Sequence, residues 1–253
     1  MEPIYVLFIL FIIAYLLVLC YSNFHGILAP IRYIQTDVQN TPYMTIDDNF
    51  YTKNECADLL LQINNSGFII NNPLTELFTN TKGFILRFIN TSHLEEQFKE
   101  HNATFIYNVF TKIKNPKCNA FACNVLIMPA RDNETNVLSG GKHHDCSMEI
   151  NEPYFPNRTY SPKCISVLYL QTPNEFTGGE LELYTFMGLS TKPNQIIKPK
   201  IGRLVEFRGD LAHAVKSFDS VEDTPRISLV FEQYIIPSHL LRTKTFEFLS
   251  KKY

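Results

Sequence analysis

The chain has 253 residues, of which 45% are hydrophobic and 19% are charged, and its formal net charge at pH 7 is −2. This is enough apolar sequence for one well-packed domain with a short appendage. Because the charge is close to neutral and no basic patch is interleaved with aromatic residues, the composition argues against a nucleic-acid-binding protein.

The chain opens with an uncharged apolar run from Ile4 to Tyr21. As a helix this run would be roughly 27 Å long, close to the hydrocarbon thickness of a bilayer. A cleaved signal peptide is the alternative, because Cys20-Tyr21-Ser22 offers small residues near a cleavage point. The length of the run and the absence of Lys or Arg before it favour an uncleaved anchor. We therefore predict a transmembrane signal-anchor helix over 1–22, followed by a stem over 23–43.

Two features predict that the remaining domain lies in the lumen of the endoplasmic reticulum. Asn-X-Ser/Thr sequons, the acceptor sites of N-glycosylation, begin at Asn64, Asn90, Asn102, Asn133 and Asn157. Cysteines outside the apolar run are Cys56, Cys118, Cys123, Cys146 and Cys164. This odd number allows at most two disulfides and one free thiol. The alternative is a cytosolic domain with five reduced cysteines.

The first half of the domain combines strands and helices. Residues 44–50 have the character of a strand, and Thr52 with Glu55 forms a capping-box pattern before a helix over 56–63. A second strand is expected over 84–88. Apolar residues then recur at helical intervals over 93–113, with a possible interruption at 102–104. These helices are expected to support a sheet.

From residue 120 onward the sequence changes to short β runs separated by Asn, Gly, Pro and Asp. The predicted strands cover residues 121–129, 164–171, 180–186, 203–207 and 227–235. Helices followed by a strand-rich half predict an α+β domain with a sandwich or barrel core over 44–237. Residues 238–253 form a modestly basic tail, with one helix as its expected structure.

Candidate metal ligands begin at His143. Asp145 is two residues further on, so both side chains leave the same face of an extended strand. His213 follows a later strand-like run, where it could face inward from a neighbouring strand. Two imidazoles and one carboxylate form the facial triad that holds non-haem Fe(II) with open positions. The alternative is chance, because a chain with seven histidines can contain such a pair by accident.

Arg226 adds a second signal, because it begins an apolar strand. An arginine that points into a core needs an anionic partner. The dicarboxylate 2-oxoglutarate is such a partner, and a guanidinium group suits bidentate carboxylate recognition.

Several motifs then occur in a fixed order: His143-His144-Asp145, Val167–Gln171, Phe176–Leu181, Ile197–Phe207, His213-Ala214-Val215 and Pro225–Leu229. In this order the chain resembles the Fe(II)- and 2-oxoglutarate-dependent dioxygenases of the prolyl-hydroxylase group over residues 45–237. It is most similar to procollagen prolyl 3-hydroxylases (leprecans) and to prolyl 4-hydroxylase catalytic domains. The HHDCS sequence at His143 is also similar to lysyl hydroxylases, which leaves the target side chain open.

The resemblance implies a double-stranded β-helix, a jelly-roll-like barrel with the metal at one open end. It implies that His143, Asp145 and His213 bind Fe(II), and that Arg226 and Tyr169 hold the distal carboxylate of 2-oxoglutarate. It also implies hydroxylation of a peptidyl side chain, most naturally proline with lysine as the alternative, and ascorbate to maintain Fe(II).

The sequence departs from the family pattern in two ways. Arg226 lies thirteen residues after His213, a few more than usual, which predicts a longer loop over 219–224. Many family members also carry Lys where this chain has Arg226. A disulfide between Cys146 and Cys164 is a further hypothesis. A non-catalytic lumenal binding protein with the same barrel, and a cupin-type isomerase, remain the rival classes.

Overall fold

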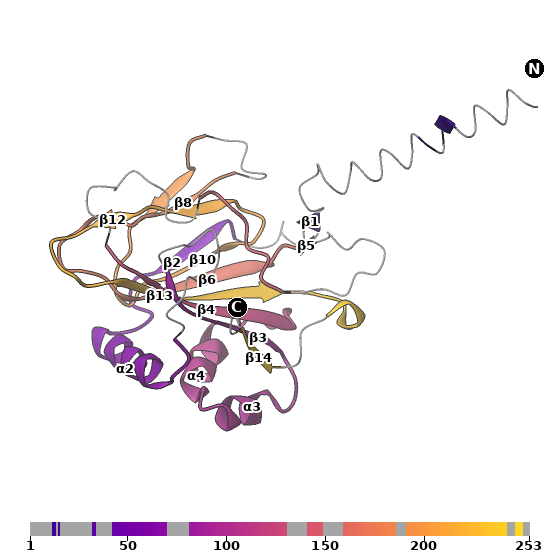
Figure 1. The fold of residues 1–253 in the computed structure, drawn as a ribbon, viewed down its shortest axis with the longest axis horizontal. Coiled ribbons are helices and arrows are strands. Elements are labelled where there is room, and N and C mark those ends of the chain that lie inside the picture. The colour runs from indigo at the N-terminus through magenta and orange to yellow at the C-terminus, as the bar shows by residue number, and fades with distance from the viewer. Residues whose placement is uncertain are drawn as a thin grey trace, which may run out of the picture.

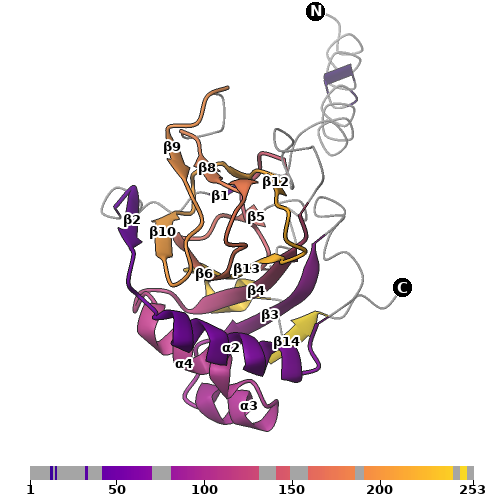
Figure 2. The ribbon, with the colours of Figure 1, turned by 90° about the vertical axis from the view of Figure 1, so that its left-hand side faces the viewer.

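A large antiparallel sheet lies between a layer of helices and a set of smaller sheets (Figure 1). The computed structural model describes residues 42–69, 81–130, 141–148, 159–185, 191–241 and 246–249, with the isolated positions 12, 13, 15, 32 and 33 before them. Figure 2 shows the helices together on one side of the large sheet and the smaller sheets on the other. This arrangement confirms the predicted α+β class and is consistent with the expected jelly roll.

The large sheet has seven strands in the order β14-β3-β4-β13-β6-β10-β2, and all neighbours are antiparallel. Its strands in chain order are β2 (Met44–Asp47), β3 (Lys82–Ile89), β4 (Ala120–Met128), β6 (Cys164–Gln171), β10 (Leu204–Arg208), β13 (Arg226–Tyr234) and β14 (Phe246–Leu249). Every residue of β13 is buried, because the strand lies at the centre of the sheet with both faces covered.

Three smaller sheets complete the strand pairings of the described residues. One has the order β11-β8-β9, made of His213–Val215, Leu181–Leu183 and Gln195–Ile197. A second pairs β12 (Phe218–Asp219) with β7 (Thr177–Gly178). A third pairs β1 (Arg32–Tyr33) with β5 (Thr159–Tyr160) in parallel. The first of these places His213 opposite the inner face of the large sheet.

The helices form where capping and periodicity predict them. Helix α2 (Lys53–Asn65) begins with the expected capping box, in which the Thr52 hydroxyl accepts from the Glu55 amide and the Glu55 carboxylate accepts from the Thr52 amide. The long periodic stretch divides into α3 (Leu94–Glu100) and α4 (Thr104–Ile113). Asn102 lies between them with φ of 55°, a conformation that Asn tolerates and that ends the first helix.

Strand alternation divides the core into two parts. On β13, Ile227, Leu229 and Phe231 pack into the cluster shared with the helices. Residues of the opposite parity face the smaller sheets, where Val230 packs with Val167 of β6 and with other buried side chains. The second face is the wall of the pocket described below.

Two glycines adopt backbone conformations that favour glycine and lie against another backbone segment. Gly202 has φ of +81°, and a Cβ atom there would lie 2.0 Å from the Tyr51 carbonyl oxygen. Gly178 has φ of +84° and a similarly close contact with the Ser217 carbonyl oxygen. Both allow the chain to turn tightly beside another backbone segment.

Two expectations for local structure are wrong. The tail contains a 3-10 turn (Ser238–Leu240) and the strand β14, because Phe246 and Phe248 extend the large sheet along β3 and pack onto its helix-side core. The Cys146–Cys164 disulfide is absent, since neither cysteine is part of a disulfide. Cys146 is exposed and Cys164 is buried, where its thiol lies against that of Cys118.

The N-terminal predictions fall largely outside the described residues. Of the predicted anchor over 1–22 only positions 12, 13 and 15 are described, and the stem over 23–43 is described at few positions. Within the part of the chain that the structure describes, no helix combines the length and apolar character needed to cross a membrane. The sequon residues Asn64, Asn90 and Asn102 are exposed, whereas Asn133 and Asn157 lie outside the described residues.

Candidate active site

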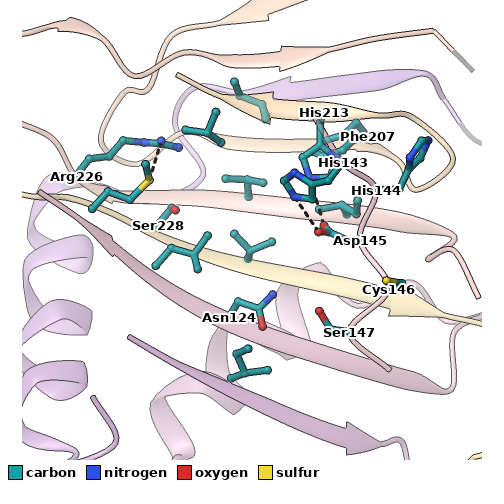
Figure 3. Close-up of a pocket in the computed structure, with 18 residues that line it drawn as sticks. Asn124, His143, His144, Asp145, Cys146, Ser147, Phe207, His213, Arg226 and Ser228 are labelled. Atoms are coloured by element: carbon teal, nitrogen blue, oxygen red, sulfur yellow. Dashed lines mark hydrogen bonds and ion pairs between the residues drawn. The ribbon is translucent and has the colours of Figure 1, made fainter. Parts of the chain in front are cut away.

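The three predicted metal ligands come together at one end of the pocket between the large sheet and β11 (Figure 3). His143 forms an isolated antiparallel bridge with His213, in which each backbone amide donates to the other residue's carbonyl oxygen at 2.9 Å. Asp145 follows two residues later on the same segment. The backbone pairing therefore brings the two halves of the predicted triad together.

The side chains of the triad converge through their metal-binding atoms. Nε2 of His143 lies 3.5 Å from Oδ1 of Asp145, and Nε2 of His213 lies 3.5 Å from Oδ2. The ligand atoms of all three residues lie within 4.8 Å of one another. Such a set matches the two-histidine, one-carboxylate arrangement that holds Fe(II) on one face.

Backbone carbonyl groups orient both imidazole rings. Nδ1 of His143 lies 3.1 Å from the Gly141 carbonyl oxygen, and Nδ1 of His213 lies 3.4 Å from that of Leu211. A proton on each Nδ1 leaves Nε2 as the free ligand atom, which is how outer contacts usually set the tautomer of a metal-binding histidine. His144 points away from the triad in Figure 3, as expected for the residue between two ligands.

The charge states of the triad favour cation binding. Burial lowers the pKa of His213 to about 4, so its imidazole is neutral at pH 7. Burial alone would raise the pKa of Asp145, but the facing His213 and His143 outweigh it and hold the pKa below its ordinary value. Burial would lower the pKa of His143, yet its contact with Asp145 raises it. An ionised carboxylate beside a neutral imidazole is the form that binds a metal.

Arg226 lies at the opposite end of the pocket from the triad, and the Tyr169 ring packs against its guanidinium (Figure 3 labels Arg226). Arg226 is 3% exposed, and Cζ of its guanidinium lies 5.1 Å from the centre of the Tyr169 ring. Its Nη1 contacts the Met128 sulfur at 3.5 Å. Among the described residues, neither Nε of Arg226 nor the hydroxyl of Tyr169 has a hydrogen-bond partner.

Buried donors without partners are rare in proteins, because each one costs free energy. A positive guanidinium group in this state is suited to an anion that both donors can reach. The carboxylate of a dicarboxylic acid fits this end of the pocket chemically. The residues that the sequence assigns to 2-oxoglutarate are therefore positioned for such a ligand.

The pocket between these ends is lined mainly by apolar side chains from the large sheet and from the β11-β8-β9 sheet: Ile85, Leu126, Met128, Ile165, Val167, Leu181, Phe207, Val215 and Val230. Its described lining includes one carboxylate, that of Asp145. An apolar lining of this kind excludes water from a reacting centre.

Sequence reasoning missed a polar group of residues beside the triad. Glu232 of β13 is fully buried and accepts hydrogen bonds from Ser147, from Asn124 of β4 and from the Tyr234 hydroxyl. Burial, with Asp145 nearby, raises the pKa of Glu232 to about 7. Ser228 was also missed and lines the pocket two residues after Arg226. The alternation of side chains along β13 would have identified both residues, because side chains two, four or six positions after Arg226 lie on the same face of the strand.

Comparison with known proteins finds similarity to solved structures. Neither a protein-family model nor a curated relative matches the sequence. A prolyl-4-hydroxylase from Pseudomonas putida is 15% identical with a TM-score of 0.42, covering 79% of this chain and 97% of its own. The viral collagen prolyl hydroxylase of Paramecium bursaria Chlorella virus-1, solved with 2-oxoglutarate, is 17% identical with a TM-score of 0.41, covering 78% and 98%.

A Trichoplax adhaerens prolyl hydroxylase, solved with a hypoxia-inducible-factor peptide fragment, is 17% identical with a TM-score of 0.44, covering 78% of this chain and 86% of its own. These proteins belong to the group that the sequence motifs resemble.

Proposed function

We propose that this protein is an Fe(II)- and 2-oxoglutarate-dependent dioxygenase of the prolyl-hydroxylase type. One observation carries the proposal: a His-Asp-His triad and a buried arginine without a described hydrogen-bond partner at Nε lie at the two ends of one pocket. A non-catalytic barrel would have no use for a buried guanidinium that forms no ion pair within the described residues, because such a cation is costly to bury.

The roles of the residues follow from their chemistry. His143, Asp145 and His213 would hold the iron from one side and leave its other positions open to ligands. Arg226 would hold the distal carboxylate of 2-oxoglutarate, with the Tyr169 hydroxyl as a second donor. When bound, iron and 2-oxoglutarate together supply the oxidation of an unactivated C–H bond by dioxygen.

The substrate we propose is a peptidyl proline. The sequence motifs most resemble those of prolyl hydroxylases, and the described lining of the pocket is mainly apolar, with Asp145 as its one carboxylate. A lysine ammonium would need an anionic partner in such a pocket, and Asp145 is engaged by the two histidines. Peptidyl lysine remains the alternative substrate, and a lumenal binding protein remains the alternative function.

The location we propose is the lumen of the endoplasmic reticulum, with the chain anchored by its N-terminal apolar run and ascorbate maintaining Fe(II). The apolar sequence of residues 4–21 and the exposure of three sequon asparagines support this. Faster migration of the protein on a gel after treatment with an endoglycosidase would support lumenal exposure. A fully unglycosylated protein extracted by salt alone would contradict it.

The test of the activity is a peptide-library assay with the full-length protein, Fe(II), 2-oxoglutarate and ascorbate. We expect succinate release coupled to a peptide mass gain of one oxygen atom, on prolyl peptides more than on lysyl peptides. His213→Ala should abolish both signals, whereas the matched variant of an exposed histidine, His239→Ala, should retain them. Binding of Fe(II) and peptide without succinate release would favour the non-catalytic alternative. Turnover indifferent to 2-oxoglutarate would favour a cupin-type enzyme.

A further inference from the structure

The segment that carries His143 and Asp145 is attached to the sheets at two points. At the first point the backbone of His143 pairs with that of His213. At the second point Ser147 hydrogen-bonds to β13 of the large sheet. Asp145 lies midway, two residues from each point, so its position depends on both attachments.

The second attachment is made by one carboxylate. The Ser147 hydroxyl donates to Oε1 of Glu232 at 2.6 Å, and the Ser147 amide donates to Oε2 at 3.1 Å. The same amide lies 3.0 Å from the Tyr234 hydroxyl, which itself donates to Oε2 of Glu232. The Asn124 side-chain amide donates to Oε1 at 2.7 Å. Both carboxylate oxygens are therefore saturated by donors from three residues.

The carboxylate of Glu232 stands at a position where it costs free energy, because it is buried in the interior of a sheet. Glu232 is 0% exposed and lies between Ala122 of β4 and Ile165 of β6 in the strand register. An apolar side chain would pack there without loss of hydration. Here both oxygens bond to a residue of the metal-binding segment, which indicates that anchoring this segment is the role of the carboxylate.

We propose that Glu232 is a positioning residue for the metal ligand Asp145, acting through Ser147. Asn124 and Tyr234 fix the carboxylate, the carboxylate fixes Ser147, and Ser147 fixes the segment on which Asp145 faces the two histidines. This inference rests on the proposed metal site. It extends that proposal to residues that do not contact the metal themselves.

The test uses the full-length protein and Co(II) as the probe, because Co(II) resists oxidation and its visible absorption reports ligand geometry. Glu232→Gln keeps the side-chain shape but replaces an acceptor oxygen by an amide donor. Ser147→Ala removes the hydroxyl bond alone. A matched pair elsewhere in the same sheet is Ser166 and Glu206, whose hydroxyl-to-carboxylate bond is 2.8 Å long.

We expect Glu232→Gln to weaken Co(II) binding by about 10- to 100-fold, as loss of an outer-shell partner usually does, and to alter the absorption spectrum of bound Co(II). Ser147→Ala should weaken binding by a smaller factor, because the backbone bond remains. Glu206→Gln should change the metal-free melting temperature without changing Co(II) affinity or spectrum, which separates positioning from general stability.

Co(II) affinity within twofold of wild type in Glu232→Gln, with an unchanged spectrum, would overturn the inference. If that variant does not fold, Ser147→Ala decides by the same two readouts. If the wild-type protein binds no Co(II), the proposed function and this inference both fail. If the wild type binds Co(II) and the variants weaken it, but no peptide is hydroxylated, the proposed function fails and the positioning role stands.

Discussion

Replacing Arg226 by methionine should make the ligand-free protein more stable and yet weaken its binding of 2-oxoglutarate. Arg226 is 3% exposed, and among the described residues its Nε has no hydrogen-bond partner. A methionine of similar length removes that buried charge, which forms no ion pair within the described residues, so the free energy of unfolding should rise by about 1 to 4 kcal/mol. For a domain of this size, each 1 kcal/mol corresponds to roughly 2–4 °C in melting temperature.

The effect on 2-oxoglutarate has the opposite sign. Truncating one partner of a buried, hydrogen-bonded charge pair costs about 2 to 5 kcal/mol, or roughly 30- to 5,000-fold in dissociation constant. Calorimetric titration of the Mn(II)-loaded protein measures this loss without turnover. Thermal melts with and without 2-oxoglutarate measure the stability of both states, since a ligand that binds only the folded state raises the melting temperature.

Arg203→Met is the matched control, because Arg203 pairs with Asp48 and does not line the pocket. It should not stabilise the protein and should leave 2-oxoglutarate binding unchanged. The reasoning would be refuted if Arg226→Met lowered the melting temperature of the ligand-free protein and bound 2-oxoglutarate within threefold of wild type. That result would mean that the guanidinium is compensated within the protein and is not available to a ligand.

Three further predictions address single groups. Tyr169→Phe removes a hydroxyl that has no hydrogen-bond partner among the described residues. It should leave the melting temperature almost unchanged and weaken 2-oxoglutarate binding by about 1 kcal/mol in the calorimetric titration. A loss of stability without a loss of affinity would count against the role assigned to the hydroxyl. Gly202→Ala forces a Cβ atom against a backbone oxygen and should lower the free energy of unfolding, measured in urea, by about 2–3 kcal/mol. The control Gly67→Ala has a similar positive φ, but its added Cβ would meet nothing within 4 Å, so it should cost less. Equal costs for the two variants would contradict the contact. The pKa of Glu232 is raised to about 7 from an ordinary 4.5, so the folded state retains a proton that the unfolded state releases. The free energy of unfolding of the wild type should therefore fall by roughly 3 kcal/mol relative to that of Glu232→Gln as pH rises from 4.5 to 8. Parallel pH profiles of stability for the two proteins would exclude that shift.

Local signals predicted the elements whose determinants lie close together in the sequence. The capping box at Thr52 and Glu55 depends on residues three apart, and the break near Asn102 depends on one short stretch. The strand character of 164–171 and 227–235 follows from continuous apolar runs, which predicted β6 and β13 almost to their ends.

The convergence of the triad could be anticipated only in part. The two-residue spacing of His143 and Asp145 is a local property of an extended chain, but the approach of His213 requires a backbone pairing that no local pattern encodes. The motif order supplied that information through resemblance. The geometry of Arg226 followed from the cost of an arginine at the start of an apolar strand.

The network around Glu232 could not be predicted in this way, because its bonds to Asn124 and Ser147 connect residues 108 and 85 positions apart. The Cys146–Cys164 pairing was wrong because the two thiols lie on opposite faces of the large sheet: Cys146 lines the pocket, whereas Cys164 precedes the pocket-facing Ile165 on β6 and lies against Cys118. The strand β14 was missed because its contribution is aromatic packing against distant helices and β3, while its own sequence is short and mixed.

Strand β13 carries Arg226 at its first residue and Glu232 six residues later, on the same face. Inserting or deleting one residue between them would turn one of the two side chains toward the helices. Arg226 and Glu232 would then no longer lie on the same face of the large sheet. The pocket can therefore be enlarged by substitutions or by changes in its loops. An insertion or deletion in β13 preserves the shared face only if it involves an even number of residues. The number of residues between Arg226 and Glu232 on β13 therefore fixes which face of the large sheet each of them occupies.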